Sequence, residues 1–340
     1  MEKFPDSSAW LATREGKVVI GHGPFVESDA RPASAVAFYV QDFGLQNPRP
    51  WKTPEWIERT TIDELTLRYR GLAPLDCKWA PLDAVPFSVV FQEVMSAIHS
   101  GEFEKTVPVV TEKGSAIPSK TASIVAAMTR QSAPLFSYGW LHGPSGFAGA
   151  TPELLFSLNG SRLETMALAG TARSEDRAVF AVDEKEIREH EYVAQTLVAK
   201  LFDLGSIKRS PREIIDLGSI VHFLTQFRLD LNAPQTPDEL IRRLHPTPAL
   251  GPLPRTVKTL SMLLEWRQRL DCPPEFGAPF GLWDQGSFHA VVAIRGIWWE
   301  GGNLMLPAGC GIIEASRLVN EWRELRLKRE AVKRFLEFPC

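Results

Sequence analysis

The chain contains the stretch Lys185-Glu186-Ile187-Arg188-Glu189-His190, and its carboxylate spacing returns in Glu321-Trp322-Arg323-Glu324. Both stretches lie in segments whose patterning predicts long helices, residues 184–202 and 314–338. Because residues i and i+3 share one helix face, each segment presents a pair of carboxylates. Two facing pairs would supply four oxygen donors, which suit a hard dication such as Mg2+. Taken alone, either pair is more often a solvated helix face.

Composition narrows the class of protein. The 340 residues are 44% hydrophobic and 23% charged, which is typical of a soluble globular protein with a large core. A formal charge of -3 gives no basic field for nucleic acid or for an anionic membrane. We expect no membrane-spanning segment and no signal peptide in residues 1–20. Cys77, Cys272, Cys310 and Cys340 lack metal-ligand spacing, so we expect a reduced, cytoplasmic compartment.

Hydrophobic periodicity predicts a mixture of strands and helices. Residues 1–85 are rich in Pro and Trp, and short alternating runs predict strands at 17–20 and 35–40. The pair Asn159-Gly160 between two apolar runs predicts a hairpin. No linker or repeat is visible, so we expect an α+β architecture with large antiparallel sheets flanked by helices. Further helices are expected at residues 87–101, 237–244 and 257–269, and strands at 135–141, 154–158, 161–168, 218–229, 290–299 and 303–307.

Small and charged residues at strand ends are the next clue. Ala169-Gly170-Thr171 and Ala308-Gly309-Cys310-Gly311 each follow an expected strand. Glycines there let a ligand approach backbone N–H groups, which bind carboxylates, although a tight turn without a ligand is the commoner case. Arg295 ends an apolar strand, where it is either a solvated rim residue or a clamp for a carboxylate. His222 lies in an apolar run, where a hydrogen-bonded core histidine is the default explanation.

Beyond the paired carboxylates, short motifs stand in a fixed order along residues 87–338. They are Ala150-Thr151-Pro152-Glu153-Leu154-Leu155, Leu168-Ala169-Gly170-Thr171-Ala172-Arg173, Val221-His222-Phe223-Leu224, His245-Pro246-Thr247-Pro248-Ala249-Leu250-Gly251 with Pro254-Arg255, Ala293-Ile294-Arg295, Ala308-Gly309-Cys310-Gly311-Ile312, and Lys328 after the second carboxylate pair. In this order they resemble the chorismate-binding enzymes. That family includes isochorismate synthases, salicylate synthases and the large subunits of anthranilate and aminodeoxychorismate synthases. The chain is most similar to the isochorismate synthases.

The resemblance implies a fold and a domain organisation. It implies one chorismate-binding domain over residues 1–340, in which two antiparallel β-sheets form a sandwich flanked by helices. Residues 87–338 would be the catalytic region. Residues 1–85 carry no matching motif and look like a shortened form of the family's amino-terminal half.

The same resemblance implies roles for individual residues. Mg2+ would be held by Glu186, Glu189, Glu321 and Glu324, and the ion would hold the ring carboxylate of chorismate. Of these four, Glu189 and Glu324 would bind it directly. Arg295 would grip the enolpyruvyl carboxylate, and Lys328 would also lie near a carboxylate. The remaining substrate-binding residues would be Ala169, Gly170, Thr171, His222, Thr247, Gly309 and Gly311.

Two positions bear on the choice of nucleophile. Family members that attack with water resemble this chain in having a lysine ahead of the strand at residues 107–110, here Lys105, and an alanine where Ala169 stands. Aminodeoxychorismate synthases typically have lysine at that second position, and anthranilate synthases threonine. Lys105 would be the general base, which requires that burial lower its pKa. Glu153, on the opposite side, would protonate the departing 4-hydroxyl. Water would attack C2, the double bonds would shift, and isochorismate would result.

Three positions depart from the family pattern. The stretch Lys105-Thr106-Val107-Pro108-Val109-Val110 lacks the usual arginine, and its proline interrupts a strand. The residues alone therefore favour a surface position for Lys105 beside two acidic neighbours. Phe276 stands where relatives often have a tyrosine that hydrogen-bonds substrate, and Pro252 stands where glycine is common.

Three functions follow as hypotheses. The leading one is a Mg2+-dependent isochorismate synthase that feeds menaquinone or catechol siderophore synthesis. The second is a salicylate synthase, which also eliminates pyruvate from isochorismate in the same site. The third is a degenerate, non-catalytic protein that binds chorismate or a partner subunit. Ala169 disfavours an amidotransferase-linked synthase, so we expect no amidotransferase subunit and, as is common for such members, a monomer.

Overall fold

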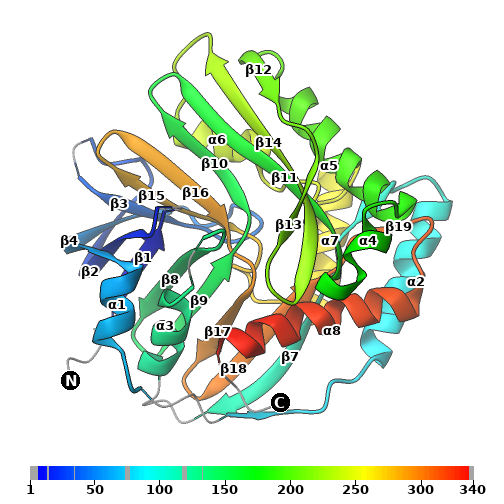
Figure 1. Ribbon diagram of the computed structural model, residues 1–340, viewed down its shortest axis with the longest axis horizontal. Coiled ribbons are helices and arrows are strands. Elements are labelled where there is room, and N and C mark those ends of the chain that lie inside the picture. The colour runs from blue at the N-terminus through cyan, green and yellow to red at the C-terminus, as the bar shows by residue number, and fades with distance from the viewer. Residues whose placement is uncertain are drawn as a thin grey trace.

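The computed structural model describes residues 7–13, 15–33, 35–72, 77–116, 121–131 and 133–336 (Figure 1). Its helices are α1 (Ile62–Arg68), α2 (Val85–His99), α3 (Thr121–Thr129), α4 (Arg177–Phe180), α5 (Glu184–Leu201), α6 (Pro237–Leu244), α7 (Val257–Arg269) and α8 (Leu318–Phe335), with a 3-10 turn at Ser174–Asp176. Its strands are β1 (Ser7–Ala12), β2 (Lys17–Ser28), β3 (Ala37–Val40), β4 (Trp51–Thr61), β5 (Cys77–Trp79), β6 (Lys105–Thr106), β7 (Val109–Ala116), β8 (Phe136–His142), β9 (Ser145–Thr151), β10 (Leu154–Asn159), β11 (Arg162–Arg173), β12 (Gly205–Arg209), β13 (Glu213–Asp216), β14 (Ile220–Leu231), β15 (Pro279–Asp284), β16 (Ser287–Val292), β17 (Gly296–Glu300), β18 (Asn303–Gly309) and β19 (Ile312–Ile313).

The strands form layers because their side chains alternate between two apolar environments. In β1, Trp10 and Ala12 pack into one hydrophobic cluster, whereas Ala9 and Leu11 pack into another. A strand turns successive side chains to opposite faces, so the second cluster is the layer enclosed between sheet faces. Pairings such as β11–β14 and β7–β18 are antiparallel. Among the residues that the structure describes, 17 strands are hydrogen-bonded in one network beside the small β6–β19 pair. The expected α+β fold of antiparallel sheets flanked by helices is confirmed.

Two helices that carry the paired glutamates meet at one end of this sandwich (Figure 1). Val193, Leu197 and Leu201 of α5 are buried in the same cluster as Phe227 of β14. Burial of each such side chain contributes about 1.5–3 kcal/mol, so this apolar stripe fixes how the helix is turned. Helix α8 packs on β18 and β11. Within the described residues, none of the helices combines the length and the apolarity that a membrane crossing requires.

Two expected elements close to the carboxylates are present but have other bounds than predicted. The single strand expected at 290–299 is two strands, since β16 ends at Val292 and β17 begins at Gly296. Between them Arg295 has a φ of 56°, a left-handed conformation that no continuous strand can contain. The helix expected at 314–338 begins only at Leu318.

The region around Lys105 also differs from expectation. The strand expected at 107–110 is confirmed only from Val109 onward, because β6 ends at Thr106 and β7 begins at Val109. Pro108 lies in the gap and has no backbone N–H to donate to a ladder. The surface position that the residues alone favoured for Lys105 is wrong, since its side chain is fully buried.

Candidate active site

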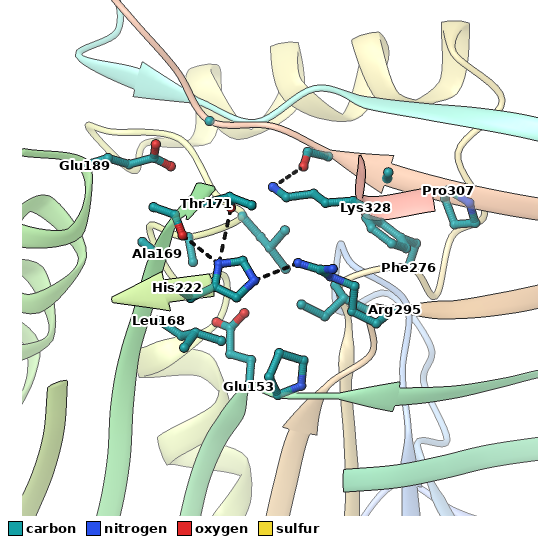
Figure 2. Close-up of a pocket in the computed structure, with 18 residues that line it drawn as sticks. Glu153, Leu168, Ala169, Thr171, Glu189, His222, Phe276, Arg295, Pro307 and Lys328 are labelled. Carbon is teal, nitrogen blue, oxygen red and sulfur yellow. Dashed lines mark hydrogen bonds between the residues drawn. The ribbon is translucent and has the colours of Figure 1, made fainter. Parts of the chain in front are cut away.

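A cavity lies where β11, β14, β18 and α8 meet the connection between β16 and β17 (Figure 2). Most of the site residues expected from the sequence line it: Glu153, Ala169, Gly170, Thr171, Glu189, His222, Arg295, Gly309, Gly311 and Lys328. The others lie one layer behind: Lys105, Thr247, Glu186, Glu321 and Glu324. The structure therefore brings both groups together at one place.

A bulge in β11 presents Gly170 and Thr171 to the cavity. The register between β11 and β14 shifts between Ala169 and Ala172, which bends the strand and frees the residues between them. Gly170 has a φ of 75°, and a Cβ there would lie 3.3 Å from Glu186 Oε2. The backbone N–H of Thr171 donates to that same Oε2 atom at 2.8 Å. The bulge therefore holds one of the clustered carboxylates.

His222 is held in one tautomer by its neighbours (Figure 2). Arg295 Nη2 lies 2.9 Å from His222 Nε2, and arginine can only donate, so Nε2 accepts. The proton is therefore on Nδ1, which donates to the Gly170 carbonyl at 2.6 Å and lies 3.2 Å from the Thr171 hydroxyl. Burial and the charge of Arg295 hold the pKa of His222 well below its usual range. His222 thus acts as a neutral bracket between the bulge and Arg295.

Arg295 is aimed into the cavity by its unusual backbone. Its left-handed backbone conformation breaks the chain into two strands, β16 before it and β17 after it. The Arg295 carbonyl accepts from Ala150 N at 3.1 Å. Burial lowers the pKa of Arg295 to about 10, so the side chain stays positive at neutral pH. A buried guanidinium in a cavity wall is suited to hold a carboxylate.

Glu153 lies on the opposite wall from Glu189 (Figure 2). Its side chain is 3% exposed, and its Oε1 atom accepts from the Thr247 hydroxyl at 3.1 Å. Burial raises the pKa of Glu153 to about 7, against the lowering effects of Thr247 and of three cations, Lys105, Lys328 and Arg295. This carboxyl can therefore carry a proton near neutral pH.

Lys105 lies behind the cavity wall rather than on it. Its Nζ atom is 3.0 Å from Glu189 Oε1. A Cβ at Gly311 would lie 2.3 Å from that same oxygen and 2.8 Å from Lys105 Cε, so only glycine leaves room for this ion pair. The backbone of Lys105 is fixed from the other side by Leu253, which donates to the Lys105 carbonyl at 2.8 Å.

Lys185 lies among the four carboxylates of α5 and α8. Its Nζ atom is 2.9 Å from Glu186, 3.4 Å from Glu321 and 3.9 Å from Glu189. In spite of burial, the charges of all four glutamates, Glu189 first and Glu324 next, hold the pKa of Lys185 above its usual range. The fourth carboxylate, Glu324, is paired with Lys328 at 2.6 Å.

The clustered carboxylates differ in protonation. Burial raises the pKa of Glu186 to about 7, with repulsion from Glu189 adding to it. Burial, followed by repulsion from Glu324, raises the pKa of Glu321 to about 8. Burial opposes the charge of Glu189 too, but the ammonium groups of Lys105, Lys185 and Lys328 more than offset it and lower the pKa. Near neutral pH, Glu186 and Glu321 can therefore hold protons, whereas Glu189 stays charged.

The carboxylate oxygens of the cluster are the right kind of ligand for a hard cation, but they do not converge on one metal position. Both carboxylate oxygens of Glu321 are buried and meet no donor with hydrogen-bond geometry among the described residues. Oxygen atoms of this kind are the ligands that Mg2+ takes. Within the same residues, no three acidic, His or Cys side chains already converge on one metal position. Lys185 stands between the carboxylates, so a dication would have to displace its ammonium.

Sequence reasoning missed Lys185 although it begins the most telling stretch. It precedes Glu186 directly and stands four residues before Glu189, a spacing at which helical ion pairs form, so a signal was present. It also missed most of the apolar wall, which comes from distant segments and has no local pattern. That wall comprises Leu168, Leu250, Ile294 and Pro307, beside Phe276.

Comparison with known proteins gives the family. Residues 79–337 match the family described as chorismate binding enzyme. The isochorismate synthase EntC of Escherichia coli K12 is 32% identical over 194 residues, which are 53% of this chain and 48% of EntC. The "salicylate biosynthesis isochorismate synthase" of Pseudomonas aeruginosa is 27% identical over 257 residues, 72% of this chain and 53% of that protein. The chain thus spans about half the length of these curated relatives.

Solved structures agree in fold. A structure described as a 2,3-dihydroxybenzoate-specific isochorismate synthase, DhbC of Bacillus anthracis, superposes with a TM-score of 0.82 at 19% identity, and covers 99% of this chain and 98% of that one. The menaquinone-specific isochorismate synthase MenF of Escherichia coli gives 0.79 at 18% identity, covering 97% and 88%. Together with the family match over most of the sequence, the chain belongs to the chorismate binding enzymes.

Proposed function

We propose that this chain converts chorismate to isochorismate. The observation that carries the proposal is the opposition of two kinds of group across one cavity (Figure 2). On one wall, Glu153 has a pKa of about 7 and can hold a proton to give. On the other, the Lys105–Glu189 pair lies behind Gly311. An acid and a base on opposite faces of a ring suit a displacement in which one hydroxyl enters and another leaves.

The proposed reaction balances in atoms and protons. Water attacks C2 and passes its proton to Lys105, which must enter this step as the neutral amine, released from its ion pair with Glu189. The double bonds shift, the C4–O bond breaks, and Glu153 gives its proton to the departing hydroxyl. One water enters and one leaves, and solvent returns both side chains to their starting states. Arg295 would hold the enolpyruvyl carboxylate in the orientation that this attack needs.

We propose Mg2+ as the cofactor, held by Glu186, Glu189, Glu321 and Glu324. Support comes from the raised pKa values of Glu186 and Glu321 and from the buried oxygens of Glu321, which pair only loosely with Lys185 at 3.4 Å. When bound, the ion would supply the positive charge that fixes the ring carboxylate of the substrate.

A product assay tests the proposed function. Purified protein is incubated with chorismate and Mg2+, without ammonia, and the products are separated by chromatography. We expect isochorismate without pyruvate. Salicylate with equimolar pyruvate would instead support the salicylate synthase alternative. No conversion, while chorismate still protects the protein against heat, would overturn the proposal in favour of a binding protein.

The role of Lys105 has its own test. Lys105→Ala removes the proposed base, so we expect kcat to fall by about 10²–10⁴-fold. Exposed Lys113, which pairs with Asp271 at 2.9 Å, gives the control Lys113→Ala, with near-normal kcat. Circular dichroism should show both variants folded. A near-normal rate for Lys105→Ala would mean that another group accepts the proton.

The pathway and setting follow from the same proposal. Isochorismate would feed menaquinone or catechol siderophore synthesis. Ala169 lines the cavity and offers no amine, which supports a reaction that needs no amidotransferase subunit. The free thiols Cys272 and Cys310 support a reduced, cytoplasmic setting, whereas Cys340 lies outside the described residues. We expect light scattering to give the mass of a monomer.

A further inference from the structure

The segment that carries Thr247 is held by a lysine outside the cavity. Helix α6 ends at Leu244, and His245, Pro246 and Thr247 follow as an irregular turn. Lys200, in the last turn of α5, places its Nζ atom 3.3 Å from the Leu244 carbonyl and 3.3 Å from the Pro246 carbonyl. One ammonium group therefore bridges both ends of the short segment that leads into Thr247.

Packing alone does not explain a lysine at position 200. Within the described residues no carboxylate forms an ion pair with Lys200. Burial, followed by the charge of Arg255, lowers its pKa to about 7. A partly buried cation without a counter-ion costs stability, so an apolar residue of the same length would serve packing better. The contacts that offset this cost are the two carbonyls at the negative end of α6.

Other contacts fix the turn on its remaining sides. His245 donates from Nε2 to the Phe43 carbonyl at 2.8 Å, and burial, which lowers its pKa to about 3, keeps that ring neutral. Arg255 donates to the carbonyls of Arg242 and Arg243 at 3.0 and 3.1 Å. Neither reaches the peptide directly before Thr247, so Lys200 alone of these three holds the Pro246 carbonyl.

The Pro246 carbonyl helps to fix where Thr247 points. The Pro246 C=O group and the Thr247 N–H group belong to one planar peptide unit, so fixing the carbonyl fixes the plane from which Thr247 begins. On the other side of the residue, the Thr247 carbonyl accepts from the N–H groups of Leu250 at 3.0 Å and Gly251 at 2.7 Å. The Thr247 hydroxyl then donates to Glu153 Oε1 at 3.1 Å. Three cations also face Glu153, namely Lys105 of β6, Lys328 of α8 and Arg295. None of these three side chains forms a hydrogen bond with residues 244–247, so the Thr247 hydroxyl is the influence on Glu153 that Lys200 changes most directly.

We propose that Lys200 is a positioning residue, which holds the turn at residues 244–247 so that the Thr247 hydroxyl reaches Glu153. As a role in catalysis, this rests on the proposed function, in which Glu153 gives the proton. Loss of the clamp frees the turn and removes a hydrogen bond that favours the charged carboxylate. The pKa of Glu153 then rises, and the acid becomes weaker.

Infrared titration of the full chain tests this without turnover. The carbonyl band that disappears in Glu153→Gln reports the protonated acid. We expect Lys200→Met to raise the pKa of Glu153 by roughly one unit, the size of one hydrogen bond to a charged group. Lys200→Arg should leave the pKa near the wild-type value. Exposed Lys208, whose side chain is 76% accessible, gives the matched control Lys208→Met, with no shift.

A second variant separates positioning from stability. Thr247→Val should shift the pKa of Glu153 as Lys200→Met does, and the double variant should shift it no further, because both act through one hydrogen bond. With chorismate, kcat of Lys200→Met should fall several-fold while KM changes little, and the alkaline limb of the pH profile should move up. Lys200→Gln replaces Lys200→Met if the latter does not fold.

The outcomes are distinct. A lower melting temperature with an unchanged pKa of Glu153 would overturn the proposal and leave Lys200 a structural residue. A further shift in the double variant would also overturn it. If Lys200→Met shifts the pKa but the wild type does not convert chorismate, the proposed function fails while the clamp on Thr247 stands.

Discussion

Glu189 and Glu153 line the same cavity, but the groups around them differ in charge. Glu189 is surrounded by the ammonium groups of Lys105, Lys185 and Lys328, which lower its pKa. Glu153 is equally buried, yet its direct partner is one neutral hydroxyl, and its pKa rises to about 7. Burial alone therefore does not set the charge of a glutamate. The neighbouring lysines keep Glu189 charged, whereas Glu153, which forms no ion pair with them, can hold a proton near neutral pH.

The largest effect should come from the charged wall. Glu324→Gln removes a charged oxygen donor from the cluster, so Mg2+ binding and turnover should both fall below detection. Glu189→Gln should do the same. Isothermal titration calorimetry measures the metal, and a chromatographic assay measures the product. Glu330→Gln, two residues after Lys328 on α8 and 41% exposed, is the control. Turnover that survives both changes, or that persists in excess EDTA, would remove the carboxylates from the proposed metal site.

Glu153→Gln, on the opposite wall, should affect proton transfer and leave metal binding unchanged. Loss of the acid should lower kcat by about 10²–10⁴-fold and remove the decline of kcat as pH rises through about 7.

Stability against pH tests the same carboxyl. The folded chain keeps the proton of Glu153 up to a pH of about 7, whereas an unfolded chain loses it near 4.3. Stability from this group is thus present at low pH and lost as pH rises through about 7. Denaturant melts of Glu153→Gln should lack that part of the pH dependence. An identical pH dependence in variant and wild type would contradict the raised pKa.

Lys185→Met should reduce the contrast in charge between the two walls, because the clustered glutamates lose the cation that they share. Without metal, the variant should be less stable than the wild type because three glutamates lose a partner within 4 Å. Saturating Mg2+ should restore more stability to the variant than to the wild type, since the ion no longer competes with an ammonium group. Differential scanning fluorimetry with and without Mg2+ measures this. Equal stabilisation of both proteins would show that the ion binds away from Lys185.

The smallest effect is expected from a substitution at Phe276. Phe276 lines the cavity, and its ring packs edge-on against Trp298 at 5.5 Å. Phe276→Tyr adds a hydroxyl that a substrate carboxylate can accept from, so KM should fall by about 3–10-fold. The free protein should lose a little stability, because the new hydroxyl is buried without a partner. Steady-state kinetics and a melting curve measure both. An unchanged KM would place the substrate carboxylates away from Phe276.

The sequence predicted the parts of the site that local spacing determines. The i, i+3 glutamates and the Gly170-Thr171 motif lie together as expected, because helix period and glycine content are local properties. The burial of Lys105 was not predictable in this way. It depends on Leu253, far along the chain, whose backbone pairs with that of Lys105. The break at Arg295 was likewise hidden, since one left-handed residue inside an apolar run leaves no periodic signal.

Ala169 and Gly311 face the same cavity but leave very different room for evolution. Any side chain at Gly311 would collide with Glu189, so that position is closed to substitution while the charged wall exists. Ala169 lines the cavity at the start of the bulge, and its small side chain belongs to the apolar cluster that includes Val193 and Ala194. A single codon change there could introduce a new reactive group without rebuilding the scaffold. The lineage could therefore acquire new chemistry at one position while the rest of the site is inherited intact.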